Sequence, residues 1–168
     1  MLWIIFLIVI IFLMKHTFDF DKFGYYLGVS ESGGNYQASN GIAFGKYQFT
    51  PATIQRISND LNMNTPSIND FLSNPNMQDL FFKTYVQEIL DYINKNNLNS
   101  FVGKPITGKR NNINTTINIY GLVAGAWLSG EGGLYNFLIH GSDKNDGYTY
   151  ISDYIAKFSQ IFNNNNIV

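Results

Sequence analysis

The stretch from Ile117 to Leu128 most constrains how this chain can fold, because it carries no charged side chain. Gly121, Gly125 and Ser129 follow one another at intervals of four residues, so they would share one face of a helix. A helix over this stretch is about 18 Å long, too short for the roughly 30 Å of a bilayer core. We therefore expect a buried central helix whose small residues let a neighbouring backbone approach closely.

Further helices are predicted around this central one from capping signals and apolar spacing. Thr50-Pro51 and Asn74-Pro75 each place a capping side chain directly before a proline at the first helical position. Apolar residues at helical spacing predict helices at 20–31, 51–61, 75–95, 134–139 and 151–162. The Asn40-Gly41 pair predicts a small β-hairpin near residues 36–50, and residues 101–116 have the composition of a loop. The expected fold class is mainly α with a small β-hairpin.

Charge and composition exclude several classes of function. Eleven Lys and Arg residues against 12 Asp and Glu give a net charge of −1 with no long basic run, so we expect no nucleic-acid partner. The chain has no cysteine, which rules out a Cys nucleophile and a disulfide framework. Its two histidines, His16 and His140, do not form a His-rich zinc motif, and we expect no metal.

The segment from Met1 to Met14 is continuously apolar. As a helix it would be about 21 Å long, so crossing a membrane would need Lys15 and His16 to reach the interface. No cationic residue precedes it and no small-residue cleavage site follows it, which favours an uncleaved membrane anchor over a cleaved signal peptide or a buried core helix. We therefore predict an anchor at 1–17, a folded domain at 18–162 and a polar tail at 163–168.

Glu31 ends the apolar face of the first predicted helix of the domain. It follows Leu27 by four residues, and Gly33 and Gly34 come directly after, where they let the backbone leave the helix and approach a ligand. A carboxyl held against apolar side chains favours its neutral form and can then act as a general acid near pH 7. An ordinary surface glutamate at a helix end is the alternative reading of the same pattern.

The residues around Glu31 resemble the core of lysozyme-like lytic transglycosylases, a superfamily that includes resuscitation-promoting-factor domains and phage-borne muralytic proteins. The resemblance rests on Glu31-Ser-Gly-Gly-Asn-Tyr36 and on Gly45-x-x-Gln48-Phe-Thr-Pro-x-Thr53, and it extends less clearly to about residue 158. It implies a lysozyme-like α+β fold, a catalytic acid at Glu31 and peptidoglycan glycan strands as the partner. It also implies glycan contacts from Tyr47 and Gln48, with neither a metal nor an organic cofactor.

Four further residues are candidates for binding the glycan: Ser32, Tyr36, Trp127 and Glu131. Trp127 stands in an Ala-Trp-Leu sequence where the family commonly has an Ala-Tyr-Asn motif, so one expected polar contact is missing. Glu131 lies among glycines and would either face the cleft or occupy a loop.

The resemblance implies a lytic transglycosylase that acts on the bond between N-acetylmuramic acid (MurNAc) and N-acetylglucosamine (GlcNAc), in a phage or virion setting of wall penetration or lysis. One alternative is a muramidase, a hydrolase that positions water with a second carboxylate such as Glu131. The other is an inactive structural or wall-binding virion protein with the same fold. Residues 1–14 predict a membrane-anchored protein, in a virion membrane or a bacterial inner membrane, with the catalytic domain facing the wall.

Overall fold

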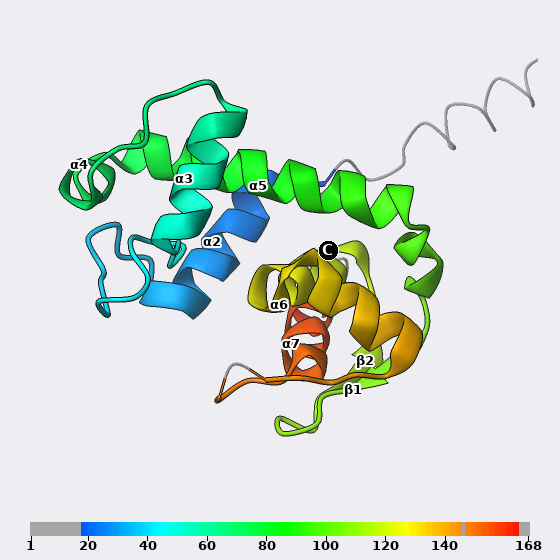
Figure 1. The fold of residues 1–168 in the computed structure, drawn as a ribbon. Coiled ribbons are helices and arrows are strands. Elements are labelled where there is room, and N and C mark those ends of the chain that lie inside the picture. The colour runs from blue at the N-terminus through cyan, green and yellow to red at the C-terminus, as the bar shows by residue number, and fades with distance from the viewer. Residues whose placement is uncertain (1–17, 146, 165–168) are drawn as a thin grey trace, which may run out of the picture.

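The computed structural model describes residues 18–145 and 147–164, and helices make up most of this part of the chain. Figure 1 shows α5 running across the top of the molecule, with α2, α3 and α4 on one side and α6, α7 and the small sheet on the other. The bounds are α2 Phe20–Ser32, α3 Pro51–Asp60, α4 Ile68–Leu72, α5 Pro75–Lys95, the 3-10 helix η1 Leu98–Phe101, β1 Pro105–Thr107, β2 Asn114–Thr116, α6 Ile119–His140 and α7 Ile151–Asn164. The prediction of a mainly helical fold with a small antiparallel pair is confirmed.

Short polar side chains begin the helices, because each accepts a backbone N–H that has no partner within the first turn. Thr50 caps α3 and Asn74 caps α5, each directly before a proline, as predicted. Asn118 caps α6 by accepting from the Gly121 amide. The position at which each of these helices begins is therefore determined by residues within its own first turn.

The central helix α6 packs closely against α7, as its spaced small residues predict. A Cβ added at Gly121 would lie 2.0 Å from Ser159 Oγ and 2.7 Å from the Ile155 carbonyl oxygen, and one at Gly125 would lie 2.7 Å from Ile155 Cγ1. At Gly130 the backbone takes φ 72° and ψ 166°, which interrupts the helix before it continues to His140. The predicted helix at 134–139 is the second part of α6.

The predicted position of the β-hairpin is wrong. Near residues 36–50 only isolated bridges form, between Ser39 and Phe44 and between Phe44 and Phe49. The Asn40 side chain accepts the amides of Ile42 and Ala43, and the Asn40 amide donates to the Ala43 carbonyl, so local hydrogen bonds close this turn without a regular β-ladder. The antiparallel pair is β1 with β2, in the stretch predicted as a loop, with Ile106 opposite Thr115.

The membrane-anchored location predicted from the sequence is corrected by the structure. Within residues 18–145 and 147–164, no helix combines the length and the apolar character needed to cross a membrane. The apolar run at 1–14 and the rest of the predicted anchor at 1–17 lie outside the described residues.

Aromatic side chains from α2, α5 and α7 meet in the core. The Phe23 ring of α2 lies 6.1 Å from the Phe82 ring of α5 and 5.6 Å from the Phe158 ring of α7, measured between ring centroids. All three side chains are buried, and burial of apolar area is the main force that holds such helices together. This packing places the first turn of α2 beside the second half of α7, and a hydrogen bond from Tyr154 to Glu31 joins the end of α2 to the first turn of α7.

Candidate active site

Glu31 lies half-buried near the end of α2 and lines a pocket of about 380 Å³. The pocket brings together four parts of the chain that lie far apart in the sequence: the end of α2, the loop between β1 and β2, α6, and α7 with the segment directly before it. Its lining residues are Ser30, Glu31, Arg110, Asn111, Leu128, Tyr148, Thr149, Asp153, Tyr154 and Lys157. The volume is large enough for part of a sugar chain.

Tyr154 holds the carboxyl group of Glu31. Its hydroxyl donates a hydrogen bond to Glu31 Oε1, and the Tyr154 side chain is only 7% exposed. The same hydroxyl oxygen lies 3.3 Å from Ser30 Oγ, which in turn accepts a hydrogen bond of 2.7 Å from Lys157 Nζ. A short network from α7 therefore orients the end of α2.

Lys157 brings a positive charge close to Glu31. Burial lowers the pKa of Lys157 from its ordinary value, and the negative charge of Glu31 opposes that shift. The half-buried ammonium group donates a hydrogen bond to Ser30 Oγ. The pocket therefore contains an acid and a partly desolvated cation within one network.

Asp153 is the second carboxyl group in the pocket lining, and backbone amides already occupy both its oxygens. It is 5% exposed; Oδ1 accepts the amides of Arg110 at 2.8 Å and Asn111 at 3.0 Å, and Oδ2 accepts the amide of Tyr150 at 3.2 Å. Asp153 thus fastens the β1–β2 loop to the start of α7.

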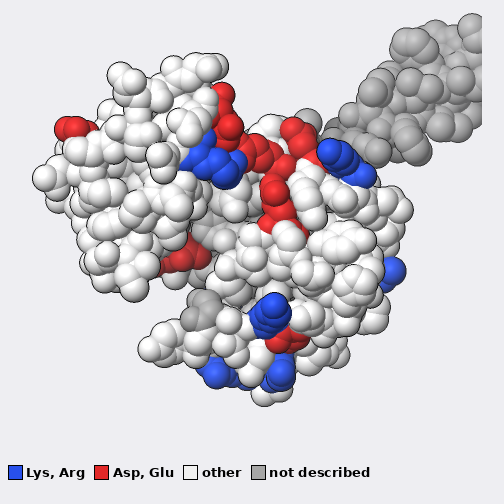
Figure 2. Space-filling model, in the orientation of Figure 1, with Lys and Arg blue, Asp and Glu red and all other residues white. Residues whose placement is uncertain are grey.

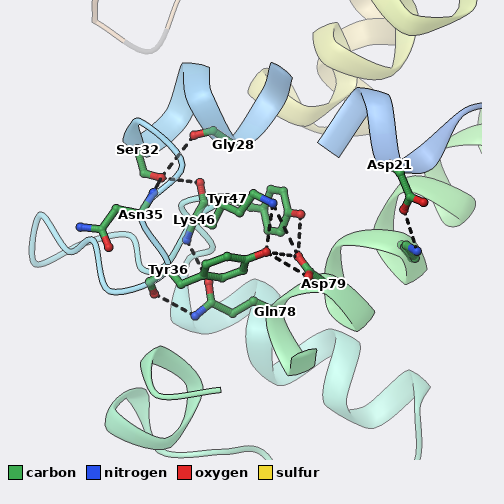
Figure 3. Close-up of polar contacts among 10 residues, drawn as sticks. Asp21, Gly28, Ser32, Asn35, Tyr36, Lys46, Tyr47, Gln78 and Asp79 are labelled. Atoms are coloured by element: carbon green, nitrogen blue, oxygen red, sulfur yellow. Dashed lines mark hydrogen bonds and ion pairs between the residues drawn. The ribbon is translucent and has the colours of Figure 1, made fainter. Parts of the chain in front are cut away.

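A second polar cluster holds the segment that follows Glu31, residues 33–49, against α5. Figure 3 shows Tyr36, Lys46 and Tyr47 converging on Asp79. Asp79 accepts hydrogen bonds from the Tyr36 hydroxyl at 3.0 Å and the Tyr47 hydroxyl at 2.7 Å, and Lys46 Nζ lies 3.8 Å from its Oδ1. Lys46 Nζ also donates to the Tyr36 hydroxyl. Tyr36 is therefore half-buried in a structural contact with α5.

Tyr47 lies in the core and not on an open wall. Its side chain is 2% exposed, and its ring stacks on Phe82 with 4.5 Å between centroids. Burial, reinforced by the hydrogen bond to Asp79, raises the pKa of the Tyr47 hydroxyl far above its ordinary range. In this structure Tyr47 holds the loop in place and offers no ring face to a sugar.

Gln78 holds the same loop, residues 33–49, through side-chain hydrogen bonds. The side chain is fully buried; its Oε1 accepts the Lys46 amide at 2.9 Å, and its Nε2 donates to the carbonyls of Tyr36 and Phe71. A Cβ at Gly45 would lie 2.2 Å from Gln78 Oε1, and Gly45 has φ 79°. Glycine is thus required there both for space and for backbone conformation.

Three other predicted residues make internal contacts. Ser32 Oγ donates to the Lys46 carbonyl at 2.7 Å, which ties the end of α2 to the loop. Gln48 is half-buried and donates its amide to the Gly45 carbonyl. Trp127 packs its half-buried ring near Tyr85, with 5.1 Å between centroids. None of the three is among the residues that line the pocket with Glu31.

Glu131 belongs to a different charged cluster. Burial raises the pKa of Glu131, while the positive charge of Arg56 opposes the shift. Arg56 itself donates to Glu88 at 2.6 Å and to Asp60 at 3.1 Å. Glu131 does not line the pocket of Glu31, so the structure separates the two glutamates that the sequence singled out.

The residues that sequence reasoning missed come from α7 and from the β1–β2 loop. Tyr154 and Lys157 are spaced three apart on one helix face, but in the sequence Tyr154 reads as part of an apolar stripe. The residues that the structure describes contain no group of three or more His, Cys, Asp or Glu side chains placed to hold a metal ion.

Comparison of the chain with protein-family models, with curated proteins and with solved structures gave no match.

Proposed function

We propose that this protein is a lytic transglycosylase of the lysozyme-like type, which cleaves the β-1,4 bond between MurNAc and GlcNAc in peptidoglycan during phage-driven wall penetration or lysis. One observation carries the proposal: the glutamate that the motif marks as the acid lines a pocket and is oriented by a buried tyrosine from another helix. A positioned carboxyl in a pocket is what general acid catalysis requires.

In the first step the Glu31 carboxyl would give its proton to the glycosidic oxygen as the bond to C1 of MurNAc breaks. Tyr154 fixes one carboxyl oxygen, which limits rotation of the side chain and keeps the acid aimed into the pocket. The N-acetyl group of the substrate would stabilise the positive charge that develops at C1. The chemistry up to this point needs no second protein carboxylate.

In the second step the ionised Glu31 would accept the proton of the C6 hydroxyl of the same sugar while O6 bonds to C1. The product carries a 1,6-anhydro ring, and Glu31 regains its proton for the next cycle. No water is consumed, because the nucleophile is already attached to the substrate. Lys157, in the same network, would stabilise the carboxylate between the two steps.

A hydrolase is the second candidate, because Asp153 lines the same pocket. Hydrolysis needs a group that activates water on the opposite face of the sugar. Both oxygens of Asp153 accept backbone amides, and Glu131 lies in the cluster with Arg56. This arrangement supports the lyase over the hydrolase.

An exposed aromatic ring at the pocket supports a carbohydrate substrate. Tyr148 lines the pocket and is 80% exposed. Such a ring offers an apolar face and a polar edge, which suits a sugar ring whose faces are apolar and whose rim carries hydroxyls. Tyr148 would therefore stack on the sugar, in place of Tyr36 and Trp127, two predicted glycan-binding residues that do not line this pocket.

The proposal is tested by comparing Glu31→Gln with Glu131→Gln on purified peptidoglycan. Glutamine keeps the shape of the side chain and cannot donate a carboxyl proton, so Glu31→Gln should clear the wall at least about 100-fold more slowly than the parent. Glu131→Gln is the matched control, since Glu131 is also half-buried but lies outside the pocket, and it should keep the parent rate. Clearing by Glu31→Gln at more than about a tenth of the parent rate would reject Glu31 as the acid.

A further inference from the structure

The β1–β2 loop is built to hold a fixed conformation next to Glu31. Asp153 accepts the amides of Arg110 and Asn111, and Asn111 Nδ2 donates back to the Asp153 carbonyl at 3.0 Å. A Cβ at Gly108 would lie 2.0 Å from Asn111 Oδ1 and 2.9 Å from Asp153 Oδ1, so only glycine fits the start of the loop. The loop backbone is therefore ordered without any ligand.

This loop presents the arginine side chain that lines the pocket. Figure 2 shows Lys and Arg side chains at the lower end of the molecule, where Figure 1 places the loop between β1 and β2. The Arg110 guanidinium donates to the Tyr148 carbonyl, and its Cζ lies 5.7 Å from the centre of the Tyr150 ring. These contacts hold the guanidinium at the edge of the pocket.

Arg110 has N–H donors that form no hydrogen bond within the part of the chain that the structure describes. Within residues 18–145 and 147–164, Arg110 forms no ion pair with a carboxylate, because Asp153 engages only the backbone amide of Arg110. A guanidinium has five N–H donors in a planar fork, and the Tyr148 carbonyl takes one side of it. The remaining N–H donors of the guanidinium can bind a carboxylate through two parallel hydrogen bonds.

We propose that Arg110 binds a carboxylate of the peptide attached to the glycan, so that the substrate class is peptide-bearing strands with free carboxylates. This inference rests on the proposed function. The hydroxyls and acetamides of the glycan are neutral, whereas the peptide on each MurNAc carries carboxylates. An anion bound by Arg110 places that MurNAc in the pocket with Glu31. Arg110 is thus a specificity-determining residue, and it takes no part in proton transfer.

The test compares two samples of one uncross-linked peptidoglycan strand: the native strand, and the same strand with its peptide carboxylates converted to primary amides. The parent protein should cleave the native strand with a kcat/KM about tenfold higher, mainly through KM, because a charge-assisted bidentate contact is lost on amidation. Arg110→Gln should cleave both strands alike, at the rate of the parent on the amidated strand. Arg110→Lys keeps the charge without the fork and should keep part of the preference.

Lys104→Gln is the matched control, because Lys104 is an exposed cation that packs on the Phe101 ring and does not line the pocket. It should keep the full preference of the parent. Equal cleavage of the two strands by the parent would overturn the role of Arg110 and leave the proposed function standing. Cleavage of neither strand by the parent would overturn the proposed function and this inference together.

Discussion

Glu31 and Glu131 are the same residue type in surroundings that give them different properties. The Glu31 carboxyl receives a hydrogen bond from Tyr154 and shares a network with Lys157. Glu131 has the cation Arg56 nearby, but burial dominates and raises its pKa. The groups around the two carboxyls therefore differ although the residue type is the same.

The raised pKa of Glu131 predicts how one substitution changes stability with pH. In the unfolded chain the pKa is near 4.5, and in the folded protein it is higher. The folded parent holds this proton more tightly than the unfolded chain, so it loses stability as the pH rises above 4.5 towards the folded pKa. Glutamine has no proton to lose. Glu131→Gln should therefore have a higher Tm than the parent at pH 7.

Thermal unfolding of the two proteins across a pH series checks this expectation. The difference in Tm between Glu131→Gln and the parent should shrink as the pH falls below 4.5, because the Glu131 carboxyl of the parent is then neutral in both the folded and the unfolded state. A lower Tm for the variant at pH 7 would show that attraction to Arg56 outweighs burial.

At the scale of elements, the contact between α6 and α7 carries the tightest packing. Gly121→Ala would push a methyl group against Ser159 Oγ and the Ile155 carbonyl, and the backbone oxygen cannot move without moving α7. We expect the free energy of unfolding to fall by about 1–3 kcal/mol. Urea denaturation measures it, with Gly132→Ala as the matched control on the same helix.

Gly132 has no atom within 4 Å of an added Cβ, so alanine there should leave stability unchanged or raise it by up to about 1 kcal/mol through helix propensity. Equal effects of the two substitutions would contradict the close approach of α6 and α7.

Elements with local signals could be predicted from the sequence, and elements held by distant partners could not. The starts of α3 and α5 follow from Thr50-Pro51 and Asn74-Pro75, because a cap and a proline act within one turn. The strands β1 and β2 are three residues long and show no alternating pattern that reading along the chain could detect. The loop after Glu31 is set by Gln78, which comes from another helix.

At the scale of the whole molecule, the pocket exists only because four distant parts of the chain meet. Glu31, which lines the pocket, could be singled out from its motif, since the glycines and the apolar stripe lie beside it in the sequence. Tyr154 is 123 residues away, and Arg110 comes from a loop that α7 fastens in place. Side chains that act together across such distances leave no spacing signal, so the sequence alone could not predict the pocket.

Under the proposed function, Glu31 cleaves glycan strands by intramolecular transfer to the C6 hydroxyl. Mass spectrometry of peptidoglycan digested by the parent protein distinguishes this reaction from hydrolysis. Transfer leaves a 1,6-anhydro end, about 18 Da lighter than the reducing MurNAc end that hydrolysis leaves. We expect anhydro ends from the parent and none from Glu31→Gln. Predominantly reducing ends, lost when Asp153 or Glu131 is replaced by its amide, would contradict transfer to the C6 hydroxyl and establish a hydrolase.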